Sequence, residues 1–179
     1  MKSLLVALGL ALCCFVQANK DQRFEDTDPS LLPGDAIVTA IASNCQKMKQ
    51  MAAGMPAFHV SFKEKSQDEL QMTMNMATPD GCKTMSPKLK KENGVFTTRC
   101  GHGGKKTMEY IQLNGDGSMF TSITLSHQGG QCSIATLTVT DLANTQGALD
   151  GFRAFARRHN LGSEEVKVLS TQGMCPPSS

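Results

Sequence analysis

The sequence predicts an all-β fold of about eight antiparallel strands, in a barrel or a sandwich, followed by one α-helix. Apolar and polar residues alternate in short runs, most clearly over residues 69–76, as expected for strands whose side chains point to opposite faces. Turn sequences such as Pro79-Asp80-Gly81 separate these runs at short intervals. The spacing of apolar residues becomes helical late in the chain, at 146–159.

The apolar face of residues 69–76 is mostly methionine, with Met72, Met74 and Met76 following Leu70. Methionine is flexible and fills irregular space. Such a face suits a wall around a variable apolar ligand better than a tightly specified core.

The alternating and helical spacings of apolar residues also predict the remaining elements. An N-terminal arm at 19–30 is expected to be loose, and 44–54 reads as a long loop with some helical tendency. Polar residues 63–68 are expected to turn the chain, and Pro87 should interrupt the strand around it. Further turns are predicted at 92–94, 101–106, 114–117 and 128–130. The strands are predicted near 36–42, 58–62, 69–76, 85–89, 95–100, 108–113, 119–125 and 132–139, with a short one at 166–169.

The first eighteen residues have the pattern of a secretory signal peptide, with Lys2 before an apolar run and Ala18 at the expected cleavage site. Residues 19–179 then form a single domain. Secretion favours disulfides, and five of the seven cysteines lie after the signal peptide, which leaves at least one unpaired within the chain. The formal net charge of +2 gives no case for nucleic acid, and no stable membrane insertion is expected.

Several segments together resemble a secreted lipocalin. Gly34-Asp35-Ala36-Ile37 sits where that family has Gly-x-Trp, Pro79-Asp80-Gly81-Cys82 resembles its cysteine after the third strand, and 152–175 resembles its last helix and tail. The sequence is most similar to the extracellular fatty-acid-binding and prostaglandin-carrying branch. The resemblance implies an eight-stranded antiparallel up-and-down barrel, with one C-terminal α-helix packed outside. It also implies a Cys82–Cys175 disulfide. Cys45–Cys132 is a possible second bridge, because the first and last strands of a closed barrel are neighbours, and Cys100 would then be the odd thiol.

The signature motifs diverge from those of the family. The family tryptophan is Ala36 here, and the arginine that lies across it aligns with Thr140. An arginine without its aromatic partner would be a partly buried charge lacking compensation, so the joint loss is coherent. The base of the barrel is therefore expected to be built differently and to be looser.

The resemblance implies extracellular binding and transport of a small hydrophobic ligand, such as a fatty acid, retinoid, steroid or odorant. One alternative is a lipid isomerase that uses a thiol inside the barrel, and another is a filled barrel that binds proteins. A siderophore site is less favoured, because Arg99 is the one cation expected on a strand and Lys105 and Lys106 belong to a turn. No catalytic residue, metal site or cofactor is expected, and a receptor or dimer partner cannot be named. The candidate ligand-binding residues are Phe58, Val60, Phe62, Leu70, Met72, Met74, Met85, Met108, Tyr110, Ile123 and Leu125.

Overall fold

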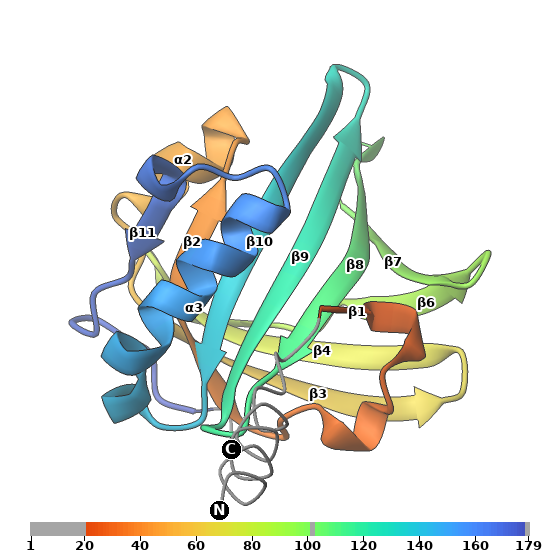
Figure 1. Cartoon of the computed structure of the whole chain (residues 1–179), viewed down its shortest axis with the longest axis horizontal. Coiled ribbons are helices and arrows are strands. Elements are labelled where there is room, and N and C mark those ends of the chain that lie inside the picture. The colour runs from red at the N-terminus through yellow and green to blue at the C-terminus, as the bar shows by residue number, and fades with distance from the viewer. Residues whose placement is uncertain (1–20, 101–102, 178–179) are drawn as a thin grey trace, which may run out of the picture.

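The computed structural model describes residues 21–100 and 103–177 (Figure 1). The predicted signal peptide lies outside these described residues. Among the described helices, none is long and apolar enough to cross a membrane. In chain order the elements are β1 (Gln22–Arg23), η1 (Phe24–Asp26), η2 (Pro29–Leu31), β2 (Ala36–Ser43), α2 (Gln46–Ala52), β3 (Phe58–Ser66), β4 (Glu69–Thr78), β5 (Gly81–Met85), β6 (Lys88–Glu92), β7 (Val95–Arg99), β8 (Lys105–Leu113), β9 (Ser118–His127), β10 (Gly130–Val139), η4 (Leu142–Asn144), α3 (Thr145–Arg158), η5 (Ser163–Glu165) and β11 (Val166–Val168).

The strands close into an antiparallel barrel with eight strand positions, which confirms the predicted fold. The sheet runs from β2 through β3, β4, β6, β7, β8 and β9 to β10, and β10 pairs again with β2. Both β5 and β6 pair with β4, and they share one position because the predicted interruption occurs at Pro87, which has no N–H to donate. Apart from β2 and β3, which are joined through α2, the consecutive strands from β2 to β10 are joined by short turns. The 92–94 turn has positive φ angles at Asn93 (53°) and Gly94 (85°), as tight hairpins require.

Two segments begin or end differently from the prediction. The strand β3 extends to Ser66, so the polar residues 63–66 belong to a strand and not to a turn. Residues 63–66 show no alternation of apolar and polar residues, because both faces of β3 are polar at this exposed end. Similarly, β8 begins at Lys105, which places Lys105 and Lys106 on a strand and shortens the predicted 101–106 turn.

A β-bulge in β8 changes which side chains face the barrel interior. Met108 lies opposite Ile123, but Tyr110 lies opposite the next residue of β9, Ser122, so Glu109 is the extra residue. One extra residue reverses the alternation after it. Tyr110 therefore lies on the outer surface, where its ring centroid is 4.7 Å from that of His159.

The closed end of the barrel lies at the β3–β4, β6–β7 and β8–β9 turns, where η1 and η2 cover it. Phe24 is 1% exposed and meets the Phe96 ring edge-on, with centroids 5.9 Å apart. It packs in a cluster with Leu32, Leu70, Leu89, Phe96, Met108, Ile111 and Met119, all of them buried. The base is built without tryptophan, as expected. It is not looser, because phenylalanine, aliphatic and methionine side chains bury one another there.

The described part of the N-terminal arm is fixed to the barrel, contrary to the expected loose arm. β1 pairs with Tyr110 and Ile111 of β8, just beyond the start of β7, where Phe96 lies opposite Met108. The Asp21 carboxylate accepts hydrogen bonds from Arg158 Nε (2.9 Å) and Nη2 (2.7 Å), and it lies 3.1 Å from His159 Nε2. Burial raises the pKa of Asp21, but the hydrogen bonds and positive charge of its partners outweigh burial, so its pKa lies below the ordinary 3.8. This group of three residues is called the Asp21 clamp below.

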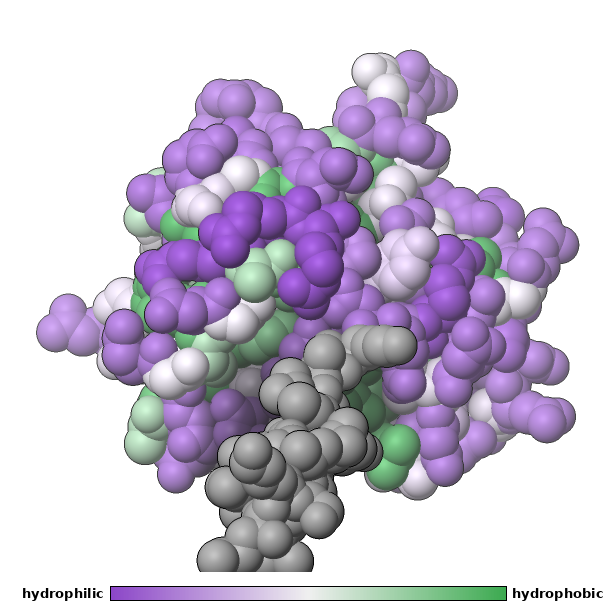
Figure 2. All heavy atoms as spheres, viewed as in Figure 1, coloured by the Kyte–Doolittle hydropathy of each residue, from purple (hydrophilic) through white to green (hydrophobic). Residues whose placement is uncertain are grey.

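The helix α3 lies against the outside of the barrel across β9 and β10 (Figure 1). Its apolar side packs on Phe120 of β9, whose ring centroid is 5.7 Å from those of both Phe152 and Phe155. Asn160 follows the helix with φ of 61°, a left-handed conformation that is common just after a helix end. Figure 2 shows that hydrophilic residues predominate on this face, with hydrophobic ones visible between them.

Two disulfides are present, Cys45–Cys132 and Cys82–Cys175. The first joins the start of α2 to β10 and the second joins β5 to the C-terminal tail. Cys100 is unpaired among the described cysteines and partly buried.

Candidate ligand cavity

A cavity opens at the end of the barrel opposite the closed end and reaches down to Leu89, Met108 and Met119 of the closed-end cluster. The cavity has a volume of about 200 Å³ and is open to solvent at its mouth. Met51 and Met85 line it and are 48% and 42% exposed, so the cavity is reachable from solvent. The lining residues are Val38, Ile41, Met48, Met51, Met55, Phe58, Val60, Phe62, Met72, Met74, Met76, Met85, Leu89, Thr98, Lys106, Met108, Met119, Thr121, Ile123, Ile134, Thr136 and Thr138.

Methionine dominates this lining. Nine of the eleven methionines of the chain face the cavity: Met48, Met51, Met55, Met72, Met74, Met76, Met85, Met108 and Met119. The strand β4 supplies three of them on one face, and Met74 lies opposite Met85 across β4 and β5. A concave, mostly apolar site of this kind suits a small organic molecule, and flexible thioether side chains allow its shape to adapt.

The structure brings eight of the predicted residues together at the cavity: Phe58, Val60, Phe62, Met72, Met74, Met85, Met108 and Ile123. Three others lie elsewhere. Leu70 points inward but is 1% exposed within the closed-end cluster. Tyr110 is turned outward by the β-bulge. Leu125 lies beside Cys132 of β10 and packs into the cluster around the rim disulfide, outside the lining.

Sequence reasoning missed most of the lining that comes from irregular segments or from small and polar residues. Met48 and Met51 are three residues apart, so they share one face of α2; this spacing could have indicated an apolar face within the predicted loop. Met55 lies just past α2 and gave no periodic signal. Thr136 and Thr138 are polar, and alternation alone did not mark them as facing inward. Thr121 shares the alternating face of Met119, Ile123 and Leu125 but, being polar, was not among the candidate residues.

Lys106 is the one charged residue among those that line the cavity in the described part of the chain. It lies opposite Thr98 across β7 and β8, and both residues line the cavity close to where β8 begins. No carboxylate is within ion-pair distance of Lys106 among the described residues. Its neighbour Lys105 differs, since its ammonium lies 3.0 Å from Glu92.

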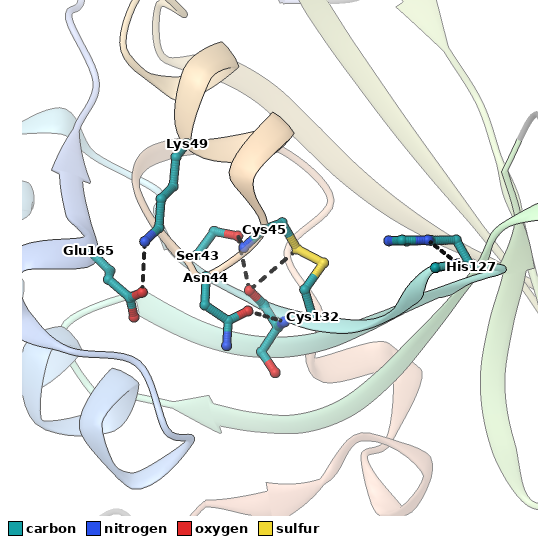
Figure 3. Close-up of a disulfide and its surroundings, with 9 residues drawn as sticks. Ser43, Asn44, Cys45, Lys49, His127, Cys132 and Glu165 are labelled. Carbon is teal, nitrogen blue, oxygen red and sulfur yellow. Dashed lines mark hydrogen bonds and ion pairs between the residues drawn. A yellow bond between two sulfur atoms is a disulfide. The ribbon is translucent and has the colours of Figure 1, made fainter.

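The helix α2 is held at the cavity mouth from two sides (Figure 3). The Cys45–Cys132 disulfide attaches its first turn to β10, and Lys49 Nζ lies 2.9 Å from a Glu165 oxygen of η5. Next to the disulfide, Asn44 Oδ1 accepts a hydrogen bond from the Ser133 backbone N–H at 2.7 Å. These contacts fix Met48 and Met51 over the opening.

The comparisons with known proteins agree with this geometry. The family model described as "Lipocalin / cytosolic fatty-acid binding protein family" matches residues 38–172. The chain belongs to the lipocalin family.

Among curated relatives, the extracellular fatty acid-binding protein of Gallus gallus is 23% identical over 175 residues, covering 98% of this chain and 97% of that protein. The protein of the same name from Coturnix japonica is 26% identical over 182 residues, with the same coverage. A solved structure described as "The Siderocalin Ex-FABP functions through dual ligand specificities" has a TM-score of 0.66 and 22% identity, covering 83% of this lipocalin and 96% of that chain. The solution structure of lipocalin 12 from rat epididymis has a TM-score of 0.71 and 17% identity, and the match covers 86% of this lipocalin and 94% of that chain. At these identities the structures support the fold alone.

Membership places this lipocalin among proteins that bind and transport small hydrophobic molecules and are not enzymes. Cys45 and Cys132 are joined to each other, and Cys100 is outside the cavity lining. Among the described residues, no group of three or more metal-ligating side chains could hold a metal ion.

Proposed function

We propose that this lipocalin is secreted and carries a long-chain fatty acid or a similar amphiphile with one acidic group. The observation that carries the proposal is the methionine-lined cavity, whose lining residues are apolar except for Lys106 and four threonines. Secretion is supported by the extracellular relatives, by the two disulfides and by the signal-peptide pattern of residues 1–18.

Lys106 favours an acid over the neutral retinoids, steroids or odorants that the shape alone would accept. An ammonium in an apolar site without a partner is unfavourable. A ligand carboxylate would supply the missing charge, and the Thr98 hydroxyl across the strand pair could donate a hydrogen bond to it. A neutral ligand would bury Lys106 without that compensation.

Displacement of a hydrophobic fluorescent probe tests the cavity. We expect about one probe per chain, displaced by long-chain acids. Met72→Lys should weaken probe binding, because it places an unpaired ammonium in the cavity. Thr73→Lys is the matched control, since Thr73 is the next residue of β4 and lies on the opposite face. Equal probe affinity in folded Met72→Lys and Thr73→Lys proteins would remove the cavity assignment.

The preference for acids is tested at Lys106. Lys106→Met should weaken binding of a long-chain acid by about tenfold or more, as loss of a charge-assisted contact predicts, while leaving the corresponding methyl ester nearly unaffected. Lys105→Met is the control, because Lys105 pairs with Glu92 outside the cavity. If acid and ester bind equally to the unmodified protein, the ligand class is wrong although carriage of a neutral ligand would stand.

A filled barrel that binds proteins is less favoured, because empty space remains between the cavity side chains. A thiol-dependent isomerase is less favoured because no unpaired cysteine lines the cavity among the described residues.

A further inference from the structure

The cavity gathers nearly all the oxidisable thioethers of the chain into the space proposed for a lipid. Hydrophobicity alone does not require this, because leucine or isoleucine would also satisfy the alternation of β4. Met72, Met74 and Met76 are partly buried, not sealed in the core, so they border the empty space. Methionine differs from leucine chemically in one respect that matters here: its sulfur accepts an oxygen atom to form the sulfoxide.

We infer that the cavity reduces fatty-acid hydroperoxides, with its methionines as the reductant. In the step, the sulfur lone pair attacks the terminal oxygen of the bound R–O–OH, the O–O bond breaks and an S–O bond forms. The hydroxyl proton passes to the departing alkoxide, giving R–OH and methionine sulfoxide. Sulfur loses two electrons and the hydroperoxide gains them, so no other reactant is needed. Each sulfur reacts once, so the protein acts as a stoichiometric reductant and not as a catalyst.

The geometry favours this reaction inside the barrel. This inference rests on the proposed ligand binding: with the carboxylate at Lys106, near the start of β8, the acyl chain would extend inward past Met108, which follows on the same inner face. Met72 and Met74 project into the same space from β4. A mid-chain hydroperoxide would then be held among several sulfurs at high local concentration, which accelerates a bimolecular step.

The accessible methionines provide an internal comparison. Met51 and Met85 are the exposed ones at the mouth, whereas Met108 is 3% exposed. Dissolved hydrogen peroxide should therefore oxidise Met51 and Met85 first. A bound lipid hydroperoxide should instead oxidise sulfurs deep in the cavity.

The experiment incubates the mature, disulfide-bonded protein with a hydroperoxide of linoleic acid and follows lipid and protein by mass spectrometry. We expect one hydroxy acid formed for each oxygen atom gained by the protein. The rate should exceed that of the urea-unfolded protein by about tenfold or more. Peptide mapping should place the sulfoxides at Met72, Met74 or Met108, and hydrogen peroxide should give the mouth methionines instead.

Variants make the test specific. A triple variant, Met72→Leu with Met74→Leu and Met76→Leu, keeps volume and apolarity and should slow hydroxy-acid formation per bound hydroperoxide. Met174→Leu is the control, because Met174 is outside the cavity lining and its removal should leave the rate unchanged. Bound hydroperoxide that is recovered intact, or sulfoxide distributed as with hydrogen peroxide, would overturn the inference alone. Failure of linoleic acid itself to displace the probe would instead overturn the proposed function.

Discussion

The two halves of the barrel interior use the same strands for opposite purposes. In the closed half, Phe24 and Ile111 are 1% and 0% exposed and pack in a buried cluster, of which only the members nearest the middle of the barrel, Leu89, Met108 and Met119, also border the cavity. In the open half, methionines border empty space. The strand β4 passes through both: Leu70 is sealed in the closed-end cluster, and Met74, four residues later on the same face, lines the cavity.

This difference shows that alternation decides which way a side chain points, but not whether it is packed. Packing here depends on what covers each end. Phe24 and η1 fill the closed end, whereas α2 lies at the rim of the mouth next to β2 and leaves the cavity open. Stability should therefore come mainly from the closed half and the α3 side, and the open half should tolerate substitution.

The largest expected effect comes from removing a disulfide. The two bridges join residues 87 and 93 positions apart, so the chain-entropy model predicts a similar loss of about 4–5 kcal/mol in unfolding free energy for each. Removal of the two disulfides should have different effects on the affinity for the fluorescent probe. Replacing Cys45 and Cys132 with serine should also weaken probe binding, because α2 loses its attachment at the mouth.

Urea denaturation and probe titration, both in a Cys100→Ser background to prevent disulfide exchange, measure these effects. Replacing Cys82 and Cys175 with serine is the control of matched loop length. Equal changes in probe affinity for the two deletions would mean that α2 is not what holds the mouth in place.

A smaller but more direct test compares single core residues of the two halves. Phe24→Ala should lower the unfolding free energy by about 3–5 kcal/mol, since it leaves a cavity in a filled cluster. Met74→Leu should change it by less than about 1.5 kcal/mol, because the substitution keeps volume and the site already borders empty space. Denaturant midpoints measure both. Similar losses would contradict the division of the interior into a packed and an open half.

The sequence was sufficient for the features that depend on local pattern. It predicted the barrel, the position of α3, the break at Pro87 and most of the inward face of β3 and β4. It could not predict the bulge at Glu109, because that extra residue is a property of the β8–β9 register and leaves no mark in β8 alone.

The prediction for the closed end was wrong for a related reason. Phe24 lies in a polar, charged segment, and its burial depends on contact with Phe96, seventy-two residues away in the chain. The composition of residues 19–30 suggested a loose arm because most of these residues are polar. The single side chain that anchors the arm, Phe24, has little weight in the composition. Lys106 was likewise assigned to a glycine-rich turn, and only the pairing of Lys105 with Arg99 shows where β8 begins.

The smallest expected effect comes from breaking the Asp21 clamp. This test shows whether the clamp adds to the attachment of the N-terminal arm that burial of Phe24 provides. Because the pKa of Asp21 is lowered on folding, its ionised form contributes stability that is fully present above pH 3.8, the ordinary value, and is lost as the pH falls through the lowered value. Arg158 is about half exposed, with 48% of its side chain accessible. Asp21→Asn should therefore cost only about 1 kcal/mol at neutral pH, and the difference from the unmodified protein should vanish in strong acid.

Asp150→Asn is the matched control, because Asp150 also accepts from an arginine of α3, Arg153, at 2.9 Å, but is 95% exposed. Its removal should change the urea midpoint negligibly at every pH, since exposed ion pairs contribute little. The two variants should therefore separate at neutral pH and converge as the solution is acidified. If they coincide throughout, the clamp adds nothing to the closed half, and burial of Phe24 is sufficient to hold the arm against β8.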